Sequence, residues 1–489
     1  MLARAASRPD QISVLASFLK PVGGLFLVIL LMACLAGPAR AVDGLDVSPG
    51  GFGIFGFDLE TGGMDLGLGC LVQPDGKLVM VGSARDDDGE FSKIAVARVG
   101  TAGTLDSGFG ISGRMSVDFD TEGYSGYDQA LARAVVVDSL GRLLVVGSLR
   151  SSSAGVRMAF VTRLNPNGTI DYSWRYNGIT GGWYFSSFLQ AVSAAALDLA
   201  GNLWILGTET QQSTGGWSYI RLDGNGNEVA TETIPVEPGF DITVPATLLF
   251  QPSSKPILAG WGQNQGPPIY AAPMLVRLVE GGADMIPDTT FGFSGDGWLV
   301  LDYAQAARLR SLAQLPDGKL AVAGESGPSG GNVDLFVQRL TPNGISDGSF
   351  EEYVAFDVGG SLADGQDGFV RMIAQSDGKV VLAARVMTGD GGNLSDIGVA
   401  RLHPNLSLDS SFGGNGTGKR VFSLSNPPPG ASDDRIDCLV LDAGKPVIGG
   451  SGEYIGTDTD FAFRRLDNAH IFSDGWESGT SFFWSAITP

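Results

Sequence analysis

The stretch Val72–Gly82, VQPDGKLVMVG, is the clearest guide to the fold because it recurs along the chain. Close copies read LPDGKLAVAG at 315–324 and QSDGKVVLAA at 375–384. An Asp-Gly turn that leads into an apolar run is typical of a β-hairpin. Weaker copies place the turn residue at Gly141, Gly201, Ser254 and Gly444. Seven copies at a mean spacing of about 61 residues indicate an array of supersecondary units.

A second repeated position is an arginine that closes an apolar run, once per repeat. It is occupied by Arg98, Arg163, Arg221, Arg277, Arg339, Arg401 and Arg465. In four repeats an aspartate follows eight residues later: Asp106, Asp171, Asp347 and Asp409. We interpret this column as ion pairs inside each unit that fix the following connector, and not as a catalytic site.

Each repeat divides into four short strands. Examples are Arg114–Phe119 for the first, Ala134–Val137 for the second, Lys319–Ala323 for the third and Leu335–Leu340 for the fourth. The 72 glycines among 489 residues argue against a helical protein, since glycine destabilises helices. The sequence predicts an all-β fold: a seven-bladed β-propeller of four-stranded antiparallel blades, with six or eight blades less favoured.

The two ends of the repeat array carry the same connector. LDVSPGGFG at 45–53 parallels LDSSFGGNG at 408–416, and FSDGW at 472–476 follows the last repeat in the same register. In a closed propeller, strands from both ends of the chain can complete one blade, and the closed ring then has only short sheet edges. The same connector at both ends is what such a ring requires. We therefore expect the termini to seal the ring.

The Gln-Pro-Asp-Gly-Lys, Arg-Leu-x-Pro-Asn-Gly and Leu-Asp-x-x-Phe-Gly elements resemble the delta-60 repeat, a β-propeller repeat of mostly uncharacterised bacterial proteins. The resemblance covers roughly residues 45–480 and is weaker in the third and fourth repeats, where Pro-Asp-Gly-Lys is replaced. It implies a propeller and secretion, and it carries no catalytic assignment. The tail that contains Phe472–Gly479 is similar to a short ending of secreted bacterial proteins.

The N-terminus has the pattern of a secretory signal. Basic residues precede the apolar run Val22–Ala36, and small residues follow around Ala41. We expect cleavage after Ala41, a propeller over 42–480 and a tail over 481–489. An alternative is a lipoprotein anchored through Cys34, because Leu31–Cys34 resembles a lipoprotein box. The expected location is extracellular or periplasmic, and no later segment is long enough to span a membrane.

A formal net charge of −21 argues against nucleic acid and anionic membranes as partners. The two histidines make histidine-based metal sites and catalytic triads improbable. We expect a monomer that has no resident cofactor.

Two cysteines, Cys70 and Cys438, each lie six residues before the turn residue of their repeat. The other repeats hold Val135, Ala195, Leu248, Leu312 and Met372 there, so the position is apolar. The first and last blades would be neighbours, which suggests a disulfide. Packed sheets lie about 10 Å apart, however, and a disulfide needs closer Cα atoms, so two buried free thiols are the favoured expectation.

The loops between the first and second strands and between the third and fourth should share one end of the ring. These loops vary in length, and variable loops on a rigid scaffold commonly bind ligands. Their acids are Asp86, Asp87, Asp88, Glu90, Glu122, Asp128, Asp364, Asp367, Asp433, Asp434, Asp458 and Asp460, and their aromatic residues are Tyr124, Tyr127, Trp217, Trp261 and Tyr454.

Among these acids, Asp86, Asp88, Asp458 and Asp460 are candidate Ca²⁺ ligands, because Ca²⁺ takes carboxylate oxygens. Solvated acidic loops are the alternative interpretation. Asp223, Asn225 and Asn227 mimic the start of a calcium loop, but they align with ordinary turns of the other repeats.

These patterns favour an extracellular binding module over an enzyme, with a polysaccharide or a cell-surface protein as its partner. The alternative is an extracellular polysaccharide hydrolase or lyase that uses carboxylates of the variable loops. No spacing in the sequence singles out a catalytic pair.

Overall fold

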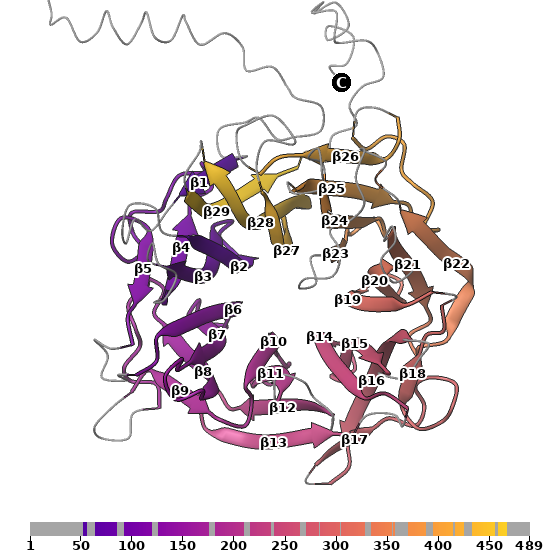
Figure 1. The fold of residues 1–489 in the computed structure, drawn as a ribbon, viewed down its shortest axis with the longest axis horizontal. Helices are drawn as coiled ribbons and strands as arrows, with labels where there is room; N and C mark the ends of the chain where they lie inside the picture. The colour runs from indigo at the N-terminus through magenta and orange to yellow at the C-terminus, as the bar shows by residue number, and fades with distance from the viewer. Residues whose placement is uncertain are drawn as a thin grey trace, which may run out of the picture. The chain divides into compact units, whose positions relative to one another are not determined.

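Seven antiparallel sheets follow one another along the chain, and the computed structural model places them in a ring (Figure 1). The chain divides into two units, Met1–Val42 and Asp43–Pro489, and the propeller belongs to the second. The structure describes residues 52–55, 64–85, 92–119, 126–175, 181–209, 216–235, 239–264, 270–282, 284–303, 305–327, 334–354, 356, 370–387, 395–413, 416–424, 433–454 and 458–466. The predicted signal segment with Cys34 and the tail lie outside these residues.

The strands of the first three blades are named in order from the innermost outward. Blade 1 is β2 (Asp65–Val72), β3 (Leu78–Arg85), β4 (Ser92–Val99) and β5 (Arg114–Val117); blade 2 is β6 (Gln129–Val137), β7 (Leu143–Arg150), β8 (Arg157–Leu164) and β9 (Trp183–Ser186); blade 3 is β10 (Ala191–Leu197), β11 (Leu203–Thr208), β12 (Trp217–Leu222) and β13 (Glu228–Ile234).

The other four blades follow in the same order. Blade 4 is β14 (Ile242–Phe250), β15 (Pro256–Gln263) and β16 (Ala271–Glu280), whose outer edge pairs with both β17 (Met285–Pro287) and β18 (Trp298–Val300); blade 5 is β19 (Ala307–Gln314), β20 (Leu320–Ser326), β21 (Asp334–Leu340) and β22 (Ser346–Val354); blade 6 is β23 (Arg371–Ala374), β24 (Val380–Met387), β25 (Ser395–Leu402) and β26 (Lys419–Phe422); blade 7 is β27 (Arg435–Asp442), β28 (Lys445–Tyr454), β29 (Asp458–Arg465) and β1 (Phe52–Phe55).

The N-terminal strand closes the ring. β1 pairs with β29 from Phe52↔Arg464 to Phe55↔Phe461, so the outermost strand of blade 7 comes from the start of the array. The expectation that the termini seal the ring is confirmed. The first strand of each sequence repeat is likewise the outermost strand of the preceding blade, as β5 is for blade 1. Blades are therefore offset from repeats by one strand.

Within the described residues the hydrophobic core consists of seven clusters, and each fills the space between two neighbouring blades. The cluster around Val79, Val96 and Phe160 joins blades 1 and 2, and the cluster around Met80, Val447 and Phe461 joins blades 7 and 1. Both faces of each blade are buried, which explains why the middle strands are apolar without alternation, as in β4.

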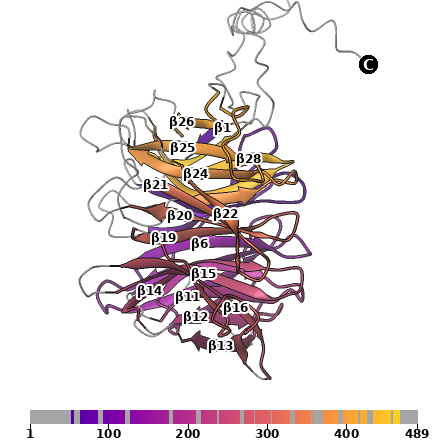
Figure 2. The same ribbon diagram turned by 90° about the vertical axis from the view of Figure 1, so that its right-hand side faces the viewer.

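Antiparallel pairing creates two distinct ends of the ring (Figure 2). The hairpin end carries the turns between the innermost and second strands and the connectors that follow the column arginines. The loop end carries the loops between the second and third strands and the links from one blade to the next.

Candidate functional site

The column arginines join each blade to the next at the hairpin end. Arg98, Arg163, Arg339 and Arg401 bond the aspartates eight residues later, which confirms the predicted ion pairs. Arg277 pairs with Asp288, eleven residues on, and Arg465 pairs with Asp442. Arg221 lies over the Trp204 ring at 5.4 Å from its centroid.

The same guanidinium groups also reach the following blade, which the sequence did not predict. Arg163 donates a hydrogen bond to the Gly224 carbonyl at 2.9 Å, and Arg277 donates one to the Pro342 carbonyl at 3.0 Å. Asp223 lies beside the first of these carbonyls and accepts hydrogen bonds from the Asn225 and Asn227 amides, so this segment forms an ordinary turn.

The lysine of the Asp-Gly-Lys turn adds a second cation to such a cluster. Lys379 lies 2.9 Å from Asp409, the carboxylate that Arg401 also holds. Burial alone raises the pKa of Asp409, but bonds from Ser411 and Lys379 and the charge of Arg401 hold that pKa well below its usual value. Asp409 is therefore ionised at neutral pH, and this motif stabilises the scaffold.

The acids that the sequence assigns to the variable loops lie only partly within the described residues. Asp86, Asp87, Asp88, Glu90, Glu122, Asp364 and Asp367, together with Tyr124, lie outside the described residues. Asp458 and Asp460 belong to β29. Within the part of the chain that the structure describes, no group of three or more His, Cys, Asp or Glu residues could hold a metal. The Ca²⁺ site remains a prediction.

Two residues assigned to the variable loops are buried, so that part of the prediction is wrong. Trp217 is 0 % exposed and packs between blades 3 and 4 against Trp298. Asp434 is also 0 % exposed and accepts hydrogen bonds from the Ser423 hydroxyl and the Leu424 amide. Both belong to the interfaces between blades and not to a contact surface.

Several of the innermost strands, which border the middle of the ring (Figure 1), carry arginines. β6 bulges between Ala132 and Ala134, while Ala132 packs toward blade 1 and Ala134 toward blade 3. The extra residue, Arg133, is left out of both packed faces and is exposed. β6 is the innermost strand of blade 2 (Figure 1), so we expect the Arg133 side chain to face the middle of the ring.

Arg310 occupies the matching bulge of β19 in blade 5. Its guanidinium bonds Glu325 at 2.5 Å and lies 5.7 Å from the centroid of the Trp261 ring, which belongs to blade 4. Arg308 lies 5.1 Å from the same ring. A carboxylate and an indole therefore fix the position of Arg310 beside the axis.

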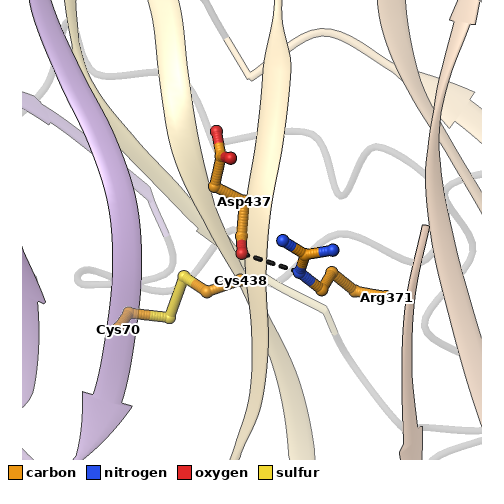
Figure 3. The surroundings of a disulfide bond; sticks show 4 residues. All are labelled: Cys70, Arg371, Asp437 and Cys438. Atoms are coloured by element: carbon orange, nitrogen blue, oxygen red, sulfur yellow. Dashed lines mark hydrogen bonds between the residues drawn. A yellow bond between two sulfur atoms is a disulfide. The ribbon is translucent and has the colours of Figure 1, made fainter. Parts of the chain in front are cut away.

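Arg371, at the start of β23, reaches from blade 6 to blade 7. Its Nε donates a hydrogen bond to the Asp437 carbonyl at 2.8 Å (Figure 3), and a terminal nitrogen bonds the Val370 carbonyl at 3.1 Å. Burial lowers the pKa of Arg371; Asp437 opposes this effect, while Arg310 and Arg133 add to it. Arg133 and Arg371 belong to blades 2 and 6, which are not neighbours in the ring.

Two more arginines extend this cluster at the loop end. Burial, followed by the charges of Arg435 and Arg133, lowers the pKa of Arg85 at the end of β3. We call Arg85, Arg133, Arg310, Arg371 and Arg435 the axial arginines. Four of the five lie in the loop-end half of their strands, and Arg133 lies at the midpoint of β6.

The axial arginines are not among the residues predicted from sequence, because each is an isolated basic residue next to an apolar run. One signal was available: Arg133 and Arg310 both lie two residues before the apolar position that Val135 and Leu312 occupy. Only the ring brings residues of distant repeats to one axis.

A disulfide joins Cys70 to Cys438, so the expectation of two free thiols is wrong (Figure 3). The Cα atoms are 5.7 Å apart, within the range that a disulfide permits. The expected spacing of about 10 Å describes the packed faces of sheets. The bridge instead joins innermost strands, β2 and β27, next to the axis.

The two cysteines are also not structurally equivalent. Cys70 pairs with Met80, two residues before Gly82, whereas Cys438 pairs with Gly449, one residue before Gly450. The hairpin of blade 7 encloses two residues, Ala443 and Gly444, where blade 1 has three between its flanking pair. Because side chains alternate along a strand, a hairpin that is one residue shorter places the corresponding side chain on the opposite face. Cys438 therefore matches Gly69 and extends toward blade 1, where it meets Cys70.

Comparisons with known proteins agree with the fold. Residues 73–109, 141–173, 315–350 and 375–412 match the family model described as "Domain of unknown function (DUF5122) beta-propeller". No curated protein matches the chain. In the described residues, no helix is long and apolar enough to cross a bilayer.

Several solved structures are similar at low identity. A protein of unknown function from Dyadobacter fermentans is 11 % identical with a TM-score of 0.43, covering 85 % of this chain and 99 % of its own. The propeller domain of the Trilobed protease from Pyrococcus furiosus is 8 % identical with a TM-score of 0.42, covering 83 % and 98 %. An α-L-arabinanase from Penicillium chrysogenum, complexed with arabinobiose, is 11 % identical with a TM-score of 0.36, covering 83 % and 93 %.

Proposed function

We propose that this protein is an extracellular binding module whose ligand contacts the loop end of the propeller at the ring axis. The observation that carries the proposal is the contrast between the two ends. At the hairpin end, repeated Arg, Asp and Lys side chains satisfy one another within and between blades. At the loop end, the axial arginines come from five different blades, and each occupies a different local environment.

The disulfide supports the extracellular part of the proposal. Disulfides persist in oxidising compartments and are rare in the cytosol. The bridge between Cys70 and Cys438 therefore agrees with the secretion signal expected over residues 1–41. A rigid ring that carries loops of different length suits a binding module, because the scaffold keeps its contact groups in place.

The proposal is tested with the full-length protein against a panel of neutral and acidic polysaccharides in affinity electrophoresis. Arg133→Ala at the loop end should release a retained polysaccharide, while Asp317→Ala at the hairpin end should not. Asp317 is a suitable control because its side chain is 53 % exposed. Loss of retention only in Asp317→Ala would overturn the proposal. New reducing ends or unsaturated products would instead favour a hydrolase or a lyase.

A further inference from the structure

We infer that the axial arginines bind an oxyanion, either a small free anion or a carboxylate or sulfate group of an acidic glycan. This inference rests on the proposed binding function and specifies the chemistry of its ligand. Guanidinium groups donate pairs of parallel hydrogen bonds to carboxylate, sulfate and phosphate oxygens.

The first support is where the side chains lie. Arg133 and Arg310 occupy the bulge positions of β6 and β19, and Arg371 begins β23. Those three strands are the innermost strands of blades 2, 5 and 6, and they border the middle of the ring from different directions (Figure 1). A convergent set of donors from several strands can surround one anion.

The second support is that two of these arginines are held in place before any ligand binds. Carbonyl groups of Asp437 and Val370 accept hydrogen bonds from Arg371. These two carbonyl acceptors orient the guanidinium. Glu325 and the Trp261 ring position Arg310. Groups that are already oriented lose less conformational entropy when a ligand binds.

The third support is that arginines of several blades gather at the loop end of an acidic protein. Four acids, Asp65, Glu325, Asp437 and Glu453, belong to the loop-end halves of the two inner strands of the same blades. Like charges brought together destabilise one another, and an anion placed between them relieves that repulsion. Burial and the neighbouring arginines already disfavour the charged forms of Arg85 and Arg371.

The net charge of −21 limits the shape of the ligand. A net negative charge repels a long polyanion more strongly than a small anion. That repulsion is screened beyond about 8 Å at physiological ionic strength. A small anion, or the anionic end of a glycan, therefore meets less of it.

The test is isothermal titration calorimetry on the full-length protein at constant ionic strength. The probes are sulfate, citrate and trigalacturonate, with maltotriose as a neutral sugar. The variants are Arg133→Gln and, as a matched control, Arg150→Gln, which removes an exposed arginine of the same blade at the same end but on β7. We expect at least one anion to bind, with affinity about tenfold or more weaker in Arg133→Gln. The control should stay within about twofold of the unmodified protein.

The outcomes separate the two proposals. Tighter binding of trigalacturonate than of citrate or sulfate assigns the anion to an acidic glycan, and the reverse order assigns it to a free small anion. If maltotriose is the only probe that binds, and both variants weaken its binding equally, the oxyanion proposal is wrong. A ligand at the loop end would still be supported. Anion binding that is equal in all three proteins overturns the axial site. If the full-length protein retains no polysaccharide in affinity electrophoresis, the proposed function itself is wrong.

Discussion

Arg277 of blade 4 donates a hydrogen bond to the carbonyl of Pro342 in blade 5, at 3.0 Å. Its Nε simultaneously bonds Asp288 of its own blade at 2.8 Å, and the Phe291 ring lies 5.0 Å from the guanidinium carbon. One side chain thus joins a connector to its own strand and to the next blade. This dual contact explains why arginine recurs once per repeat.

Arg277→Met should lower the free energy of unfolding by about 3–5 kcal/mol, because it breaks a buried ion pair. Arg277→Lys should recover only part of the loss, since lysine cannot form the same planar set of bonds. Urea unfolding measures both. Lys93→Met is the control: Lys93 and Asp118 form an exposed pair, 36 % and 35 % accessible, worth under about 1 kcal/mol. Equal effects at the two sites would contradict this role.

The free energy of unfolding should fall as the solution is acidified. Bonds and charges from neighbouring Lys, Arg and Ser groups hold the pKa of Asp106, Asp171, Asp288, Asp347 and Asp409 below the usual value, against the opposing effect of burial. A depressed carboxylate stabilises the fold fully above its unfolded pKa near 4 and progressively less as pH falls toward its folded pKa.

Urea titrations between about pH 7 and pH 2 measure this dependence. Stability should be nearly constant above about pH 5 and decrease below it. Asp288→Asn should be less stable than the unmodified protein at neutral pH, and the gap should narrow on acidification. If the difference in the free energy of unfolding widens at low pH instead, the pKa of Asp288 is not lowered by folding and this prediction is wrong.

Gly344→Ala should be more destabilising than Gly201→Ala. Both glycines have positive φ, 79° and 83°, so each substitution costs about 1 kcal/mol from backbone strain. A Cβ on Gly344 would lie 2.7 Å from the Phe291 ring of the preceding blade, whereas a Cβ on Gly201 meets nothing within 4 Å. Thermal melting of both variants, and of Gly344→Ala with Phe291→Leu, separates the two effects. Failure of Phe291→Leu to relieve the loss would exclude the ring as its cause.

Exchanging Cys438 and its neighbour should abolish the disulfide without changing the composition. In Cys438→Leu/Leu439→Cys the thiol would move to the side that Leu439 now uses, where it packs toward blade 6. Alkylation and mass spectrometry of the folded protein should then find Cys70 free. The stability should fall by about 2–5 kcal/mol, because the bridge closes a loop of 368 residues. A persisting link from Cys70 to position 439 would disprove the register argument.

Calcium should raise the melting temperature if Asp86, Asp88, Asp458 and Asp460 bind it as predicted. Ligands that bind only the folded state stabilise it in proportion to the logarithm of their concentration above the Kd. A calorimetric scan in millimolar Ca²⁺, with Mg²⁺ as the control ion, measures the shift. An unchanged midpoint in Ca²⁺, or an equal shift in Mg²⁺, would remove the calcium site.

The hairpin end could be predicted from sequence because its interactions are local. Arg339 and Asp347 lie eight residues apart and appear as a spacing that repeats. Their second contact, to the blade that follows, spans about one repeat, and no pattern within one repeat reveals it. The loop end is different: its axial arginines belong to separate repeats, and nothing in the sequence associates Arg133 with Arg371.

The fold class, the seven units and the closure by the termini follow from the amino-acid sequence alone, because apolar runs, turn residues and repetition are encoded within each repeat. That Cys70 and Cys438 meet follows only from the packed ring. A hairpin shorter by one residue reverses the side of β27 on which Cys438 lies, and ring closure brings strands 368 residues apart to a Cα separation of 5.7 Å. Side-chain direction and long-range proximity arise from packing, which no single repeat contains.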